Sequence, residues 1–345
     1  MLRLLLINLI LLCLSITPSL LAQKIDTTQF KQVIRDTLNY EYDTLSKAQY
    51  DSTLFLEPVR FRFTKFISGA TFWSARFDSD AYFGNAEFKL KAYFEAAQFN
   101  SRVEFSNARF LPETYFFNAQ FGSITYFYST QFDSLVDFYN AKFSSLAKFQ
   151  KTQFKLGAEF NSTQFDSKAD FREAQFGSWT EFSRAQFASK ADFQNSYFRL
   201  GTYFEYARFD SIVTFKDAQI DLETDFESTQ FNSVADFESV RFDSVVNFEG
   251  ARFNSLANFH DARFQGSVVL DSCLLPDTLY FTRVKTAEEI DFTYAITDTL
   301  AESTKRCVID LYGTDISKIK LDYSRFKVLR DTAKYQRRQL SNIYE

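Results

Sequence analysis

Residues 136–160 read VDFYNAKFSSLAKFQKTQFKLGAEF, and this stretch decides the fold. Phe stands here at 138, 143, 149, 154 and 160, so the spacing alternates between five and six residues. Phe keeps this spacing without a slip at 66, 72, 77, 83, 88, 94, 99, 105, 110, 116, 121, 127, 132, 138, 143, 149, 154, 160, 165, 171, 176, 182, 187, 193, 198, 204, 209, 215, 226, 231, 237, 242, 248, 253, 259 and 264, with Ile220 in one place. Phe55 and Phe61 extend the phase upstream; Leu270, Leu275, Phe281 and Phe292 extend it downstream. Self-similarity over so many copies indicates a repeat architecture.

The position two residues before each Phe holds a small residue. It is Ala, Thr, Val or Ser from Ala70 to Val268. Side chains at i−2 and i lie on one face of an extended segment. Ser or Asn often stands two places after Phe, as at Ser79 and Asn85, and both favour turns. Each unit is therefore predicted to be a very short strand followed by a corner.

An eleven-residue period is also typical of a right-handed helical coiled coil. Steps of five and six residues, however, place consecutive Phe side chains about 140° and 120° apart in opposite senses around a helix, which gives no apolar stripe. The helical interpretation fails, and a solenoid of stacked short strands remains.

The unit Ala75-Arg76-Phe77-Asp78-Ser79 resembles the repeat of the pentapeptide-repeat family, with Phe where that family usually has Leu. The alternating spacing resembles the Phe-centred branch of the family in exported bacterial members, and the resemblance covers residues 55–292. It implies an all-β fold, a right-handed quadrilateral β-helix with four units and about 22 residues per coil. Roughly eleven coils at a strand spacing of about 4.8 Å predict a rod about 50 Å long.

The residue before each Phe points outward and forms ladders along the rod. Two ladders are rich in Gln, Arg and Lys: Gln98, Gln120, Lys142, Gln164, Gln186, Arg208, Gln230 and Arg252 on one side, and Gln131, Gln153, Gln175, Gln219, Arg241 and Arg263 on another. The other two carry acids: Glu104, Asp170, Asp192 and Asp236, and Asp137, Glu159, Glu181 and Asp225. Stacked Gln side chains stabilise neighbouring strands through amide hydrogen bonds.

Stacked acids such as Asp170 and Asp192, or Glu159 and Glu181, have the oxygen ligands that hard cations favour. The alternative is a solvated face flanked by Lys148, Lys168 and Lys190, and this is our expectation, with no metal site. Four outward Tyr gather in the early coils as a candidate partner surface: Tyr82, Tyr93, Tyr115 and Tyr126. Packing under the N-terminal segment is the alternative for these rings.

The two ends depart from the repeat. Residues 1–22 have one charge, Arg3, then an apolar run and Ala22, which predicts a secretory signal peptide. Residues 23–54 are expected to be a partly helical cap, because Phe30, Val33, Ile34 and Leu38 fit one helical face. Residues 293–345 are expected to form a small α/β C-terminal cap ending in a basic helix from Asp331 to Glu345. That helix stops without a C-cap, so we expect the chain to be a piece of a longer protein.

The composition argues against a catalytic function. His260 is the single His, no nucleotide-binding or nucleophile motif occurs, and we expect no catalytic residue, no cofactor and no enzyme activity. The net charge of −5 provides no concentrated basic surface for nucleic acid. Cys273 and Cys307 are the two cysteines after the signal; they are candidates for a disulfide in an oxidising compartment, unless Cys273 is a core residue.

These features predict a non-catalytic scaffold, exported to the periplasm, cell envelope or medium, with a protein or envelope partner and no membrane span after signal removal. Two alternatives stay open. One is DNA mimicry, because some pentapeptide-repeat proteins bind type II topoisomerases. The other is the extracytoplasmic part of a membrane sensor or channel-like protein.

Overall fold

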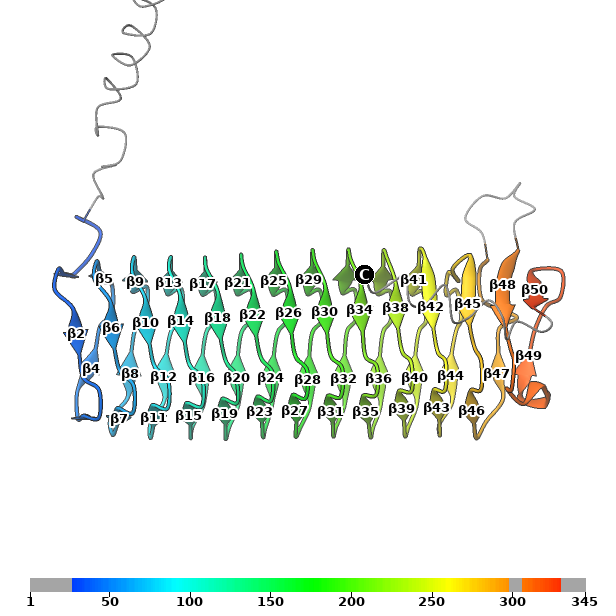
Figure 1. The fold of residues 1–345 in the computed structure, drawn as a ribbon, viewed down its shortest axis with the longest axis horizontal. Helices are drawn as coiled ribbons and strands as arrows, with labels where there is room; N and C mark the ends of the chain where they lie inside the picture. The colour runs from blue at the N-terminus through cyan, green and yellow to red at the C-terminus, as the bar shows by residue number, and fades with distance from the viewer. Residues whose placement is uncertain (1–26, 298–305, 330–345) are drawn as a thin grey trace, which may run out of the picture.

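The computed structural model describes residues 27–297 and 306–329 of the chain. These residues form a rod of stacked coils, with the N-terminal coil at the left of Figure 1 and the C-terminal strands at the right. About 13 coils of roughly 22 residues follow one another. Neighbouring coils pair in parallel. The predicted all-β solenoid is confirmed.

The chain passes through four long sheets, A to D, once in each coil. Sheet A consists of β1 (Gln32–Ile34), β5 (Thr53–Phe55), β9 (Arg76–Phe77), β13 (Gln98–Phe99), β17 (Gln120–Phe121), β21 (Lys142–Phe143), β25 (Gln164–Phe165), β29 (Gln186–Phe187), β33 (Arg208–Phe209), β37 (Gln230–Phe231) and β41 (Arg252–Phe253). Sheet B consists of β2 (Leu38–Asn39), β6 (Val59–Arg60), β10 (Ala81–Tyr82), β14 (Val103–Glu104), β18 (Thr125–Tyr126), β22 (Ala147–Lys148), β26 (Ala169–Asp170), β30 (Ala191–Asp192), β34 (Val213–Thr214), β38 (Ala235–Asp236), β42 (Leu256–Asn258), β45 (Thr278–Tyr280), β48 (Cys307–Asp310) and β50 (Phe326–Leu329).

Sheet C consists of β3 (Thr44–Leu45), β7 (Lys65–Phe66), β11 (Glu87–Phe88), β15 (Arg109–Phe110), β19 (Gln131–Phe132), β23 (Gln153–Phe154), β27 (Gln175–Phe176), β31 (Tyr197–Phe198), β35 (Gln219–Ile220), β39 (Arg241–Phe242), β43 (Arg263–Phe264) and β46 (Lys285–Thr286). Sheet D consists of β4 (Ala48–Gln49), β8 (Ala70–Thr71), β12 (Ala92–Tyr93), β16 (Thr114–Tyr115), β20 (Val136–Asp137), β24 (Ala158–Glu159), β28 (Thr180–Glu181), β32 (Thr202–Tyr203), β36 (Thr224–Asp225), β40 (Val246–Asn247) and β44 (Val268–Val269). Because each coil visits A, B, C and D in turn, sheets B and D lie on opposite sides of the rod.

The Phe rings fill the interior in continuous stacks. Phe83 of one coil stacks on Phe105 of the next, with ring centroids 4.9 Å apart. Across the axis, Phe83 meets Phe94 edge to face at 5.6 Å and 88°. Both arrangements are favoured by the quadrupole of the ring. The small residue two places earlier is also buried, as at Ala81 and Ala92, so large and small side chains together fill each coil.

Two kinds of corner alternate around the coil. Between sheets B and C, Ala86 N–H donates to the Phe83 carbonyl at 3.0 Å, and Asn85 has φ +58°. The corner between D and A repeats this arrangement, with Ala96 at φ +53°. A β-turn with positive φ at its third residue is tight and favours Asn or Gly. These corners take the five-residue step, so the extra residue of the six-residue step lies in the corners from A to B and from C to D.

The N-terminal segment differs from the prediction. No helix occurs in residues 27–54, so the helical cap is wrong: Val33 and Ile34 lie in β1 and pair with Leu54 and Phe55 of β5. The physical reason is the exposed edge of the first regular coil, whose backbone groups need partners. Leu56 N–H, for example, donates to the Ile34 carbonyl at 3.0 Å. Capping is thus performed by one more irregular coil.

The described part of the C-terminal segment also continues the solenoid. Strands β48 and β50 extend sheet B, while β47 (Ile290–Asp291) pairs with β49 (Ile319–Lys320). A 3₁₀ turn, η2 (Ile316–Lys318), precedes β49. The expected α/β cap is therefore wrong over 306–329, because buried Ile309 and Phe326 prolong the apolar interior. The signal peptide predicted for residues 1–22 and the basic helix predicted for residues 331–345 lie outside the described residues. Among the residues described, no helix has the length and apolar character needed to span a membrane.

Candidate functional site

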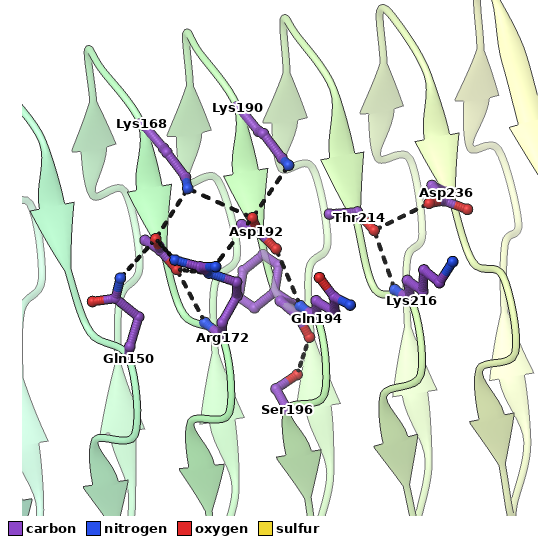
Figure 2. Close-up of polar contacts among 12 residues, drawn as sticks. Gln150, Lys168, Arg172, Lys190, Asp192, Gln194, Ser196, Thr214, Lys216 and Asp236 are labelled. Atoms are coloured by element: carbon purple, nitrogen blue, oxygen red, sulfur yellow. Dashed lines mark hydrogen bonds and ion pairs between the residues drawn. The ribbon is translucent and has the colours of Figure 1, made fainter. Parts of the chain in front are cut away.

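Sheet B carries a line of buried carboxylates on its outer side. Asp170 and Asp192 pair in register on neighbouring coils, and Asp236 lies two coils further on. Their exposed fractions are 2%, 3% and 0%. The expectation of a solvated acidic face is wrong here, because the side chains that flank the carboxylates in sequence fold over them (Figure 2).

Each of the first two carboxylates is held by cations. Asp170 accepts from Arg172 Nε at 2.8 Å, from Lys168 Nζ at 3.0 Å and from Gln150 Nε2 at 2.8 Å. Burial raises the pKa of Asp170, but the hydrogen bonds from Arg172 and Lys168 outweigh it and hold the pKa below its ordinary value. Lys190 Nζ lies 3.2 Å from Asp192, and Lys168 bridges to the same carboxylate at 3.6 Å.

Asp236 is surrounded by neutral donors on its own face. Asn258 Nδ2 donates to it at 2.9 Å, Thr214 Oγ1 at 3.2 Å and Glu238 N–H at 3.1 Å. Every one of these three carboxylates thus has several donors around it. Satisfied buried polar groups fix the register of the coils, and we assign a structural role to this line. Within the described part of the chain, no group of three acidic, His or Cys side chains could hold a metal ion.

Sheet D presents the opposite arrangement, which we call the acidic face. Its outward positions and those two residues to either side carry the following carboxylates: Asp51, Glu95, Glu113, Asp137, Glu159, Glu181, Glu205, Glu223, Asp225, Glu227, Glu249 and Asp271. Asp137, Glu159 and Glu181 are direct neighbours on three successive coils. The ion pair of Glu113 with Lys91, at 3.7 Å, is at the N-terminal end of the face. Among the described residues, no Lys or Arg pairs with the stacked Asp137, Glu159 and Glu181.

The electrostatics of the acidic face reflect this lack of cations. Burial raises the pKa of Glu159, and the charges of Asp137 and Glu181 raise it further. Burial likewise raises the pKa of Glu205, followed by the charges of Asp225 and Glu181. Like charges directly opposite each other destabilise a sheet. The carboxylates of the acidic face therefore repel one another. On sheet B, by contrast, Lys168, Arg172 and Lys190 neutralise the stacked carboxylates.

Exposed aromatic rings flank the acidic face. Phe117 and Tyr139 stack on each other, with centroids 5.5 Å apart, and are 39% and 42% exposed. Trp73 occupies the equivalent position on an earlier coil and is 48% exposed, whereas Trp179 stands two residues before Glu181, on the other side of the strand, and is 36% exposed. Aromatic rings at the surface are characteristic of protein interfaces. The combination of unpaired carboxylates and exposed rings makes this face the candidate functional site.

The structure does not bring the four predicted Tyr together. Tyr82 and Tyr126 lie on sheet B, whereas Tyr93 and Tyr115 lie on sheet D at the opposite side. A single surface formed by all four is therefore wrong, because Tyr82 and Tyr93, like Tyr115 and Tyr126, are 11 residues apart, which corresponds to half a coil. Tyr93 and Tyr115 stack at 5.4 Å at one end of the acidic face. Arg102 lies between the rings of Tyr82 and Tyr126, at 5.9 and 4.6 Å from their centroids.

The other sequence candidates are placed as follows. Cys273 and Cys307 are free and buried; Cys273 lies in the corner after β44 and Cys307 in β48, so the disulfide is not formed in this structure. Cys273 occupies the small inward position that Ala fills in other coils, and burial raises the pKa of Cys307 to about 12. His260 faces Thr282 Oγ1 through Nδ1 and Arg283 through Nε2.

The Gln ladders of sheets A and C have the predicted register. Gln131 and Gln219, however, donate to Asp133 and Asp221 within their own coil. Amide bonds between coils come from Asn instead, as from Asn140 to Asn118 at 2.6 Å. The shorter Asn side chain at a corner reaches its copy one coil away without losing much rotamer freedom.

A parallel β-solenoid with Phe and small residues in alternating inward positions is the class of protein that these observations define. Residues 226–274 match the family model for pentapeptide repeats (9 copies). The coils before this region keep the same register, which supports the resemblance of the chain to pentapeptide-repeat proteins. No curated protein matches it. Among solved structures, a trypsin-treated variant of QnrB1, a plasmid-mediated fluoroquinolone resistance protein, aligns at 13% identity over 90% of this chain and 96% of that chain. The TM-score of this alignment is 0.14.

Proposed function

We propose that this protein is an exported, non-catalytic scaffold whose acidic face binds a protein partner with a basic surface. The observation that carries the proposal is the stack of Asp137, Glu159 and Glu181, which lack the cations that sheet B provides for its own carboxylates. A purely structural rod gains stability by neutralising such a stack. The repulsion is relieved when cationic side chains of a partner approach, because charge complementarity favours association.

The aromatic rings support the same interpretation. Phe117, Tyr139 and Trp179 supply apolar contact area next to the carboxylates, and their π faces attract Lys and Arg of a partner. Export is proposed from the sequence of residues 1–22, which has the pattern of a secretory signal. The partner is accordingly expected in the periplasm, the cell envelope or the medium.

The binding proposal is tested by titrating a fluorescent deca-lysine peptide into the purified protein at low and at physiological salt. We expect binding that weakens with salt, and a loss of at least tenfold in affinity for Glu159→Gln/Glu181→Gln. The matched control is Asp166→Asn/Asp210→Asn, which removes two charges from sheet A and is expected to change the affinity less than twofold. Equal losses in the two double variants would overturn the acidic face as the binding surface.

Export is tested separately by cell fractionation of the tagged protein and by the N-terminal mass of the mature chain. A mature chain beginning at Gln23 outside the cytoplasm supports the proposal. An intact Met1 in the cytoplasm would overturn export and leave the binding result standing.

The same carboxylate stack favours a second candidate function, DNA mimicry toward a type II topoisomerase. A protein that mimics DNA needs a regular row of negative charges along a rod, in place of the phosphates. Inhibition of gyrase supercoiling by the purified protein, abolished by Glu159→Gln/Glu181→Gln, is the result expected from this function. Unchanged supercoiling at micromolar protein would exclude it.

A further inference from the structure

A basic cleft lies near the C-terminal end of the rod, away from the acidic face. It has a volume of about 420 Å³ and is lined by Ser239, Arg241, Asp261, Arg263, Arg283 and Lys285. These residues come from β39, β43 and β46 of sheet C and from the corner that precedes each strand, at the lower right of the rod in Figure 1.

Two parallel rows of side chains form the walls of the cleft. Arg241 pairs in register with Arg263, and Arg263 with Lys285, so three cations stand in line on successive coils. Consecutive members of the row are about 4.8 Å apart along the backbone. The other row stands at the corner and ends with Arg283.

The charges of the cleft are only partly compensated. Arg283 Nε donates to Asp261 at 2.7 Å, and its Nη2 also contacts His260 Nε2 at 2.7 Å. Arg241 Nε donates to Asp243 at 2.5 Å. In residues 27–297 and 306–329, no carboxylate forms an ion pair with Arg263 or Lys285. The lining therefore has four cations against the single carboxylate of Asp261.

The sheet itself does not require cations at these positions. Earlier coils of sheet C fill the same row with Gln131, Gln153 and Gln175, which stack without charge repulsion. Replacement of Gln by Arg and Lys in the last coils stacks like charges and is unfavourable for the fold alone. An anion in the cleft would offset that repulsion.

We propose that this cleft binds a linear oligophosphate, a ligand with at least two phosphate groups in a row. The planar guanidinium groups of Arg241 and Arg263 match the oxygens of a phosphate in bidentate geometry, and Lys285 adds a point charge. A row of three cations spaced along the rod fits an extended chain of anionic groups better than a single compact anion. The site is independent of the acidic face and of the proposed scaffold function.

The test is isothermal titration calorimetry of the full chain with tripolyphosphate and with inorganic phosphate at low salt. We expect tripolyphosphate to bind at least tenfold more tightly than inorganic phosphate. The double variant Arg263→Gln/Lys285→Gln introduces the residue that sheet C already uses, and it is expected to fold and to lose at least tenfold in affinity for tripolyphosphate. Far-ultraviolet circular dichroism and the urea midpoint confirm that this variant is folded.

The matched control, Arg252→Gln/Lys142→Gln, removes one Arg and one Lys from sheet A, where Gln also fills several of the equivalent positions. Its affinity for tripolyphosphate is expected to stay within twofold of the unmodified chain. Three results would overturn the site: no heat of binding at millimolar tripolyphosphate, equal affinity for the single phosphate, or the same loss in the control as in the cleft variant.

Discussion

Arg172 and Asp170 form a bidentate ion pair on the outer side of sheet B, with Nε 2.8 Å from Oδ1 and Nη2 2.9 Å from Oδ2. The Asp170 side chain is 3% exposed, whereas that of Arg172 is 43% exposed. Loss of the guanidinium therefore leaves a buried charge short of donors, while loss of the carboxylate leaves a cation that water can reach.

We expect Arg172→Ala to lower the free energy of unfolding by about 1.5–3 kcal/mol, the value of hydrogen bonds to a charged group. Asp170→Ala is expected to be less destabilising, because Arg172 regains solvent. Urea denaturation of both single variants and of the double variant measures the asymmetry. A larger effect of Asp170→Ala would contradict it.

Phe160 tests the ring stack at the middle of the rod. Its ring is fully buried and stacks at 4.9 Å on Phe138 and at 4.7 Å on Phe182. We expect Phe160→Ala to lower stability by about 3–5 kcal/mol, because a cavity forms between two close-packed coils. Phe160→Leu, which keeps a large apolar side chain at this position, should be milder. Thermal unfolding followed by circular dichroism compares the two; equal midpoints would exclude a role for the ring itself.

Gly250 and Gly84 both lie at corners but differ in backbone conformation, so they can be compared by the same substitution. Gly250 has φ +64°, and an added Cβ would lie 3.2 Å from Ser228 Oγ. We expect Gly250→Ala to be destabilising by about 1 kcal/mol, because the left-handed conformation disfavours a Cβ. At Gly84, where φ is ordinary and the nearest atoms would be 3.6 Å away, Ala is expected to stabilise by about 0.4–1 kcal/mol by restricting the unfolded chain. Chemical denaturation measures both, and effects of the same sign would contradict the corner geometry.

The acidic face predicts an unusual dependence of stability on pH. Burial, then Asp137 and Glu181, raise the pKa of Glu159 above its unfolded value of about 4.3. The folded state then binds the proton more tightly, so stability increases as the pH falls from 7 through the folded pKa toward 4.3. The lowered pKa of Asp170 acts in the opposite sense below about pH 4, where its contribution is lost.

We therefore expect the urea midpoint to rise between pH 7 and pH 5 and to fall below pH 4. Glu159→Gln should reduce the rise, because it removes one repelling charge at every pH. Asp166→Asn on sheet A is the control and should leave the rise unchanged. A midpoint that falls steadily from pH 7 to pH 5 would show that the stacked carboxylates do not repel in the folded state.

The buried thiols give the last prediction. Burial, and then the charge of Asp277, raise the pKa of Cys307. Because the thiolate is the reactive form, we expect both Cys273 and Cys307 to react with iodoacetamide only after unfolding in urea. Mass spectrometry of the native and the unfolded protein measures the labelling. Rapid labelling of either residue in the native protein would contradict its place in the interior.

The repeat could be predicted from the sequence because each of its parts has a local signal. The Phe at 138, 143, 149, 154 and 160 recur at a spacing that only a solenoid buries, and the small residue two places earlier identifies the inward face. The N-terminal coil could not be predicted, since Val33 and Ile34 fit a helical face equally well. Their strand conformation comes from pairing with Leu54 and Phe55, a contact made 21 residues away.

The candidate site, too, could be predicted only in part from the sequence. The 22-residue period alone aligned Glu159 with Glu181 and Asp170 with Asp192, because register follows from the repeat length. The tertiary structure decided that these two stacks differ. Side chains at the flanking positions fold over Asp170 and neutralise it, whereas the positions that flank Glu159 and Glu181 hold Gly, Asn, Trp and Ser. Sequence thus determined which residues meet, since local periodicity sets the register. Only the packing of neighbouring coils decided whether stacked carboxylates are neutralised by Lys or Arg, because burial and ion pairing depend on side chains from several coils at once.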